Sequence, residues 1–170
     1  RAAGVLPVFS DTSVVDYIHL YGEPKREQFR ALLGMAEAYF PMIEEELTRQ
    51  GLPLDLKYLP MAMSAMNAQA VSNTGEAGLW MLSWPVALRY GLRVTAEVDE
   101  RNDVRKSTTA ALHYLKDLYT RYGNWNTAVA AFACGPANVT RARQRGKGVT
   151  DLRIIYPFMS ESHRDVLPML

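Results

Sequence analysis

Apolar residues spaced three or four positions apart run through most of this chain, and that spacing constrains its fold more than any other feature. Between residues 25 and 50 the apolar series is Phe29, Leu32, Leu33, Ala36, Phe40, Ile43 and Leu47. Such a series lines one face of a helix, and residues 103–122 repeat it. No two alternating segments are joined by hairpin turn residues. The sequence therefore predicts an all-α fold.

Glycine and proline separate the expected helices. The first long helix covers residues 25–50 and should be kinked or divided at Pro41, because proline removes a hydrogen bond inside a helix. Residues 54–67 are apolar on nearly every side, so we expect them to form a helix in the core. The other helices are expected at residues 14–20, 76–80, 85–90, 103–122, 125–134 and 137–145, and at the end of an irregular segment, 150–170; loops are expected at 72–75 and 95–102.

Size and charge restrict the class of protein. The chain has 170 residues, 48% of them hydrophobic, which suits one domain over residues 1–170. A net charge of +1 argues against a nucleic-acid partner bound through phosphates. No apolar run approaches the roughly 20 residues that cross a bilayer. The chain begins at Arg1 without a signal-peptide pattern, so we expect a mature or trimmed fragment.

Spacing alone assigns no chemistry to the titratable residues. The acids concentrate in two groups that we expect to be solvated: Glu44, Glu45 and Glu46, and Glu97, Asp99, Glu100 and Asp103. Metal sites need grouped ligands, whereas the histidines are far apart: His19, His113 and His163. The single cysteine, Cys134, excludes an internal disulfide and is expected to be a buried free thiol. No metal or cofactor is expected.

Three blocks of sequence, in order, give more information. Residues 59–67 read Leu-Pro-Met-Ala-Met-Ser-Ala-Met-Asn, residues 78–81 read Gly-Leu-Trp-Met, and residues 130–135 read Ala-Ala-Phe-Ala-Cys-Gly. Together they resemble the signature blocks of the lytic transglycosylases, lysozyme-like enzymes that cut bacterial peptidoglycan. The similarity runs from about Val14 to the C-terminus and is nearest to the membrane-bound type D branch. It implies a lysozyme-like helical domain, with residues 1–50 as a lead-in to a core of 51–170, in a periplasm or cell envelope.

The positions at which that family performs its chemistry differ here. Its first block reads Pro-x-x-Glu-Ser, and this Glu is the only catalytic acid and base; the resemblance puts Met63 at that position, followed by a retained Ser64. A thioether neither donates nor accepts a proton at accessible pH. The resemblance therefore implies a degenerate, largely apolar cleft made of Met63, Ser64, Met81 (family Gln), Phe132 (family Tyr), Ala133 (family Asn) and Val166 (family Tyr).

Two further positions leave alternatives open. Glu76 stands where the family usually has Ala; it is either a helix N-terminal Glu favoured by the dipole or a substitute acid, which would need an apolar pocket to raise its pKa. Trp84 has no family counterpart and is a candidate contact for glycan or for protein, if it faces the surface. Trp80 and Trp125 are expected to pack in the core.

We therefore expect a catalytically inactive lytic-transglycosylase-like domain of a bacterial envelope protein. It would bind peptidoglycan glycan strands or another envelope protein, and the loss of polar groups favours the protein. The alternative is an active peptidoglycan lytic transglycosylase that uses a non-standard acid such as Glu76. Met63 should lie at the base of a cleft, near Met81, Phe132 and Val166, with no carboxylate close enough to replace the lost one.

Overall fold

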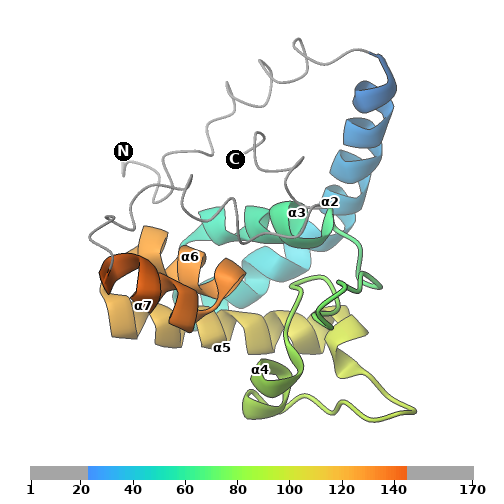
Figure 1. Ribbon diagram of the computed structural model, residues 1–170. Helices are drawn as coiled ribbons and strands as arrows, with labels where there is room; N and C mark the ends of the chain where they lie inside the picture. Colours follow the sequence, from blue (N-terminus) through green and yellow to red (C-terminus); the bar gives the residue numbers. More distant parts are fainter. Residues whose placement is uncertain (1–22, 145–170) are drawn as a thin grey trace.

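The computed structural model describes residues 23–144, and all of its regular elements are helical (Figure 1). In chain order they are α2 Glu23–Gln50, the 3-10 helix η1 Leu54–Tyr58, α3 Leu59–Ser64, α4 Trp84–Arg89, the 3-10 helix η2 Glu100–Asn102, α5 Val104–Tyr122, α6 Trp125–Cys134 and α7 Pro136–Gln144. The predicted all-α class is confirmed, and within this range only isolated β-bridges occur. None of the described helices is both long enough and apolar enough to cross a membrane.

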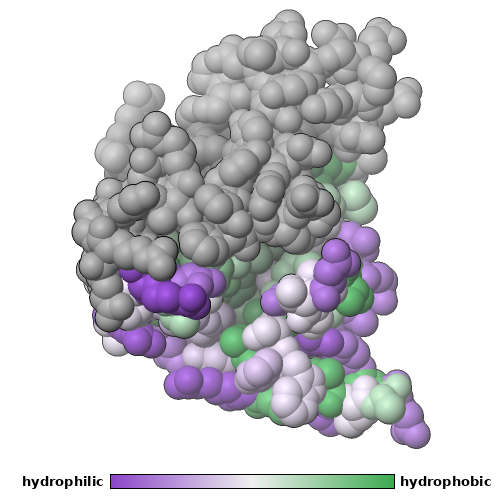
Figure 2. All heavy atoms as spheres, in the orientation of Figure 1, coloured by the Kyte–Doolittle hydropathy of each residue, from purple (hydrophilic) through white to green (hydrophobic). Residues whose placement is uncertain are grey.

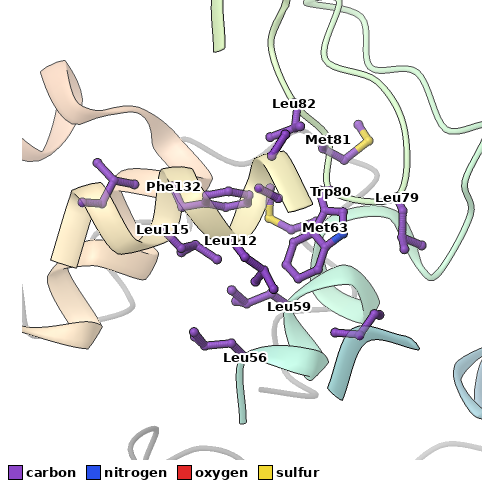
Figure 3. Packing of buried hydrophobic residues seen from close by; sticks show 14 of the residues in the cluster. Leu56, Leu59, Met63, Leu79, Trp80, Met81, Leu82, Leu112, Leu115 and Phe132 are labelled. Atoms are coloured by element: carbon purple, nitrogen blue, oxygen red, sulfur yellow. The ribbon is translucent and has the colours of Figure 1, made fainter. Parts of the chain in front are cut away.

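The core forms around α5, which packs against α2 and α6. Its apolar face is fully buried and carries Leu112 and Leu115 (Figure 3). The helix begins where the Asp103 carboxylate accepts the Lys106 N–H, and it ends at Gly123, whose φ of 67° closes the last turn. Figure 2 shows a strongly hydrophilic patch over α7.

The helix around Pro41 is not divided. α2 continues from Glu23 to Gln50 with Pro41 inside it, and it changes direction along its length (Figure 1). A bend without a break is a common result of proline in a helix, because only one backbone hydrogen bond is removed. Pro41 is exposed, so the carbonyl that loses its partner can be hydrated.

The single helix predicted for residues 54–67 is wrong in detail. The segment is split into η1 and α3, with Pro60 in the first turn of α3, where proline is tolerated. α3 ends at Ser64 because Ala65 and Met66 take positive φ values of 50° and 61°. Apolar periodicity located the buried segment correctly, but it contained no signal for this left-handed pair.

The short helix predicted for residues 76–80 is also absent. Those residues belong to a tight loop whose ends are joined by a bridge between Ala77 and Leu82. Farther along, the predicted loop over 95–102 contains η2 and a buried Glu100, which is only 7% exposed. Glu100 accepts hydrogen bonds from Lys106 and Arg93, and these lower its pKa to about 2, so the expectation that it is solvated is corrected. The predicted segments 14–20 and 150–170 lie outside the described residues.

Candidate functional site

A cavity of about 390 Å³ lies where α3, α5, α6 and the loop after α3 meet. Its apolar lining is contributed by Met63, Met81, Leu82, Val86, Phe132, Ala133 and Pro136. Polar side chains line the rest of it: Ser72, Thr74, Glu76, Ser83, Tyr114, Cys134 and Asn138. The expected apolar character is therefore correct for only part of the wall, and sequence reasoning missed most of the polar groups.

Five of the predicted cleft and contact residues share this cavity. They are Met63, Glu76, Met81, Phe132 and Ala133, which come from three segments of the chain: α3, the loop after it and α6. Ser64 and Trp84 do not line it, and Val166 lies outside the described residues. Glu76 brings a carboxylate into the same cavity as Met63, as the alternative of a substitute acid requires and against the expectation that no carboxylate would lie near Met63.

Met63 sits in the last turn of α3 and is 8% exposed, next to the Trp80 and Phe132 rings in one packed cluster (Figure 3). Ser64, the next residue, has a structural role. Its hydroxyl lies 3.1 Å from the Pro60 carbonyl oxygen and 2.8 Å from that of Leu79, and these two acceptors share its one proton. This contact ties α3 to the following loop, so the positions of Met63 and Met81 are set relative to each other by main-chain anchors.

The loop over residues 78–81 is closed at its neck. Ala77 and Leu82 exchange backbone hydrogen bonds of 3.1 and 3.0 Å, and Met81 takes a φ of 49° to complete the turn. Gly78 has a φ of 83°, and a Cβ placed on it would lie 1.9 Å from the Arg101 carbonyl oxygen. No side chain larger than hydrogen fits there, because the η2 backbone occupies the space.

Arg101 holds both ends of that loop. Its guanidinium is buried and donates from Nη1 to the carbonyl oxygens of Gly75, at 2.7 Å, and Leu82, at 3.1 Å. The charge is balanced by Asp99, whose carboxylate oxygen lies 2.6 Å from Nη2. A buried guanidinium needs both a counter-charge and acceptors for its remaining N–H groups, and this one has them.

Trp80 is a core residue, as predicted. The indole is fully buried, its Nε1 donates to Thr108 Oγ1 at 2.9 Å, and its ring meets Phe132 edge-on at 6.2 Å. Trp125 is half-buried and stacks on Tyr119 with ring centroids 4.2 Å apart. Trp84, by contrast, is 53% exposed at the start of α4, so it faces the surface.

Glu76 does not begin a helix, so the interpretation based on the helix dipole is wrong. Its carboxylate accepts hydrogen bonds from the hydroxyls of Ser72 and of Thr74, the latter at 2.5 Å. Burial acts to raise the pKa of Glu76, but these hydroxyls, its own N–H and the Arg101 charge together lower that pKa below its ordinary value. The side chain is therefore ionised at neutral pH, whereas a general acid must hold a proton there.

Tyr114, Cys134 and Asn138 also line the cavity. Burial raises the pKa of Tyr114 to about 12, so the phenol stays protonated and can donate. Cys134 is free and half-buried rather than buried, and its thiol donates to the Ala130 carbonyl; burial also raises its pKa. Asn138 donates to the Cys134 carbonyl at 2.6 Å and accepts from Arg141. Within residues 23–144, no three metal-ligating side chains come together.

The helices and the cavity define a lysozyme-like helical domain. Residues 40–154 match the Transglycosylase SLT domain family, and the chain belongs to that family. A protein from Alteromonas sp. (strain M-1), named for tributyltin chloride resistance, is 36% identical over 108 residues, which is 63% of this chain and 52% of that protein. The membrane-bound lytic murein transglycosylase D of Escherichia coli, from strain K12 and from strain O6:H1, is 34% identical over 140 residues.

The match to transglycosylase D covers 79% of this chain and 30% of the Escherichia coli protein. The chain thus spans about half of the first relative and less than a third of the other two. The recognised blocks and the family match agree on the fold.

Proposed function

We propose that this domain binds peptidoglycan in a bacterial cell envelope without cleaving it. One observation carries the proposal: the side chain of Met63 lines the cavity, and the resemblance assigns position 63 to the family's catalytic acid. A methionine there cannot protonate a leaving oxygen. Family membership supports the glycan as the ligand, because the SLT relatives include a murein transglycosylase.

In this proposal Glu76, whose carboxylate lines the cavity, does not replace the missing catalytic acid. Glu76 is held ionised by two hydroxyls, and a carboxylic acid that donates a proton near neutral pH needs the reverse, a pKa raised by an apolar pocket. The same hydroxyls and the Tyr114 phenol are suited to bind a sugar, because its hydroxyl groups both donate and accept hydrogen bonds.

One experiment tests both halves of the proposal. The domain is incubated with purified insoluble peptidoglycan, the pellet is assayed for bound protein, and the supernatant is searched for anhydro-muropeptides. We expect protein in the pellet and no released product. Released anhydro-muropeptides would overturn the non-cleaving part, and failure to sediment, combined with capture of one specific envelope protein, would replace the glycan by that partner.

The second candidate is an active transglycosylase that uses Glu76, favoured by the presence of this carboxylate in the same cavity as Met63. It requires cleavage by the unmodified domain and its loss in Glu76→Gln. In our proposal neither the unmodified domain nor the Glu76→Gln variant cleaves peptidoglycan. The two candidate functions are therefore distinguished by whether the unmodified domain releases product.

Glu76→Gln is also expected to lower the free energy of unfolding by roughly 1 kcal/mol at pH 7, because the charged acceptor of two hydroxyls is lost. The folded-state pKa of Glu76 is below its ordinary value, so its stabilising effect is fully present above the unfolded-state pKa and is lost as pH falls through the folded-state pKa. In urea unfolding, the difference between the two proteins should be largest at pH 7 and should shrink as the pH is lowered toward the folded-state pKa. A difference that stays constant as the pH falls until Glu76 is protonated would contradict this account.

Trp84→Ala is expected to weaken sedimentation with peptidoglycan about tenfold and to leave the thermal midpoint unchanged, because the exposed indole contributes contact area without supporting the core. Leu88→Ala removes an exposed apolar side chain one turn farther along α4 and serves as the matched control. Equal binding by the Trp84→Ala protein and the unmodified domain would exclude this aromatic as a platform.

A further inference from the structure

A second cavity, of about 540 Å³, adjoins the first between α4, α5 and the start of α7. Val86, Tyr114 and Pro136 line both, so the two form neighbouring compartments along one surface. The motifs that carry the family resemblance contribute little to the second one. Its distinguishing residues are two arginines, Arg89 in α4 and Arg121 in α5.

Neither of these two guanidiniums is paired with a carboxylate of the described residues. Arg89 and Arg121 each rest over the ring of the tyrosine that follows in the chain, at 5.9 and 5.4 Å from the ring centroid. Contact with a ring limits the motion of a guanidinium while leaving its N–H groups available. Asp117 also lines the cavity, but its carboxylate accepts the Tyr90 hydroxyl at 2.7 Å.

The two positive charges act on the same group. Tyr114 lies between the rings of Tyr90 and Phe132, 5.5 Å from each, at the boundary of the two cavities. Burial raises the pKa of Tyr114, and the charges of Arg89 and Arg121 both oppose that increase. Each guanidinium is therefore close enough to influence the electrostatic potential at the boundary, where an anionic part of a ligand would enter.

We propose that the second cavity binds a carboxylate of the short peptide attached to the glycan, with Arg89 and Arg121 as its cationic donors. This inference rests on the proposed peptidoglycan binding and names the part of the ligand that occupies the second cavity. Guanidinium forks match the two oxygens of a carboxylate, and two of them outweigh the one charge of Asp117. The sugar would lie in the first cavity and the acidic peptide in the second.

Calorimetric titration of the 170-residue chain tests this with four probes. They are a disaccharide-peptide, the same compound with its carboxylates amidated, a glycan strand freed of peptides, and inorganic phosphate. We expect the disaccharide-peptide to bind at least about tenfold more tightly than its amidated form at low salt, and this ratio to fall as salt is added. Phosphate should compete only weakly if the peptide carboxylate is the proper ligand.

The variants separate charge from shape. The double variant Arg89→Gln, Arg121→Gln should remove the preference for the free carboxylate, whereas Arg105→Gln, an exposed arginine of α5 that lines neither cavity, should keep it. Asp117→Asn retains an acceptor for Tyr90 and removes the opposing charge, so binding should strengthen about threefold. Equal binding of the free and amidated forms, or a double variant that behaves like the unmodified domain, overturns this inference alone. Failure to bind even the peptide-free glycan overturns the proposed function with it.

Discussion

Gly78→Ala is expected to lower the free energy of unfolding by at least about 3 kcal/mol, because the substitution combines a backbone clash with a strained φ. The new Cβ would meet the Arg101 carbonyl oxygen at 1.9 Å, and neither main-chain segment can move freely. Arg101 is fixed by its bonds to Gly75 and Leu82, so a shift of η2 would break those bonds as well. Chemical denaturation followed by circular dichroism measures the loss.

Gly75→Ala is the matched control for this clash. Gly75 has a similar φ, +91°, but a Cβ there meets nothing within 4 Å. The free energy of unfolding of this control should therefore fall by only roughly 1–2 kcal/mol, the cost of placing alanine in the left-handed region. If the two alanine variants are equally stable, the close approach of η2 to Gly78 does not constrain the loop as described.

Met63→Glu is expected to leave the domain without lytic activity and to lower its free energy of unfolding by roughly 2–4 kcal/mol at pH 7. The new carboxylate would lie among Met81 and Phe132, which offer no hydrogen bonds, so desolvation would raise its pKa in the folded state. The penalty is then largest above that raised pKa and disappears below the unfolded-state value of about 4.3. Unfolding at pH 7 and pH 4 and a muropeptide assay provide the measurements.

Met63→Gln separates the effect of charge from that of polarity, because glutamine has nearly the shape of glutamate but does not titrate. Its stability should not vary with pH relative to the unmodified domain. Release of anhydro-muropeptides by Met63→Glu alone would show that Met81, Phe132 and Ala133 are compatible with catalysis. A combined variant, Met63→Glu with Met81→Gln, Phe132→Tyr and Ala133→Asn, restores four of the side chains that the resemblance assigns and is the form in which we expect cleavage to return.

The helices that form through local signals were predictable from the sequence. Residues 125–134 were expected to be helical, and α6 has those bounds; α5 starts one residue late because Asp103 serves as its cap. In both cases a capping side chain and a glycine mark the ends. The bounds over residues 54–67 and 76–80 were not predictable in this way; in the first of these segments the helix ends at Ala65 and Met66, two residues whose type does not signal a positive φ.

The candidate site was predictable only where the family resemblance supplied the positions. It brought together Met63, Met81, Phe132 and Ala133, and the cavity contains all four. The hydroxyls around Glu76 come from a turn that looked purely connective. Composition could not show that Arg101 would be buried, because exposure of a charged residue is the ordinary case and the two carbonyls that accept from it, those of Gly75 and Leu82, lie 26 and 19 residues away in the chain.

The hydrogen bonds and close contacts that hold the cavity's shape are made mainly by residues other than the apolar ones that line it. Ser64 meets the Leu79 carbonyl, Arg101 meets the carbonyls of Gly75 and Leu82, and Gly78 admits the η2 backbone. None of these contacts uses the Met63 side chain, so the frame persists when that residue changes, although the new side chain alters the stability of the fold. A lineage can therefore exchange one chemistry for another, or for none, by accumulating substitutions in the cavity, and each intermediate along that route inherits the same scaffold.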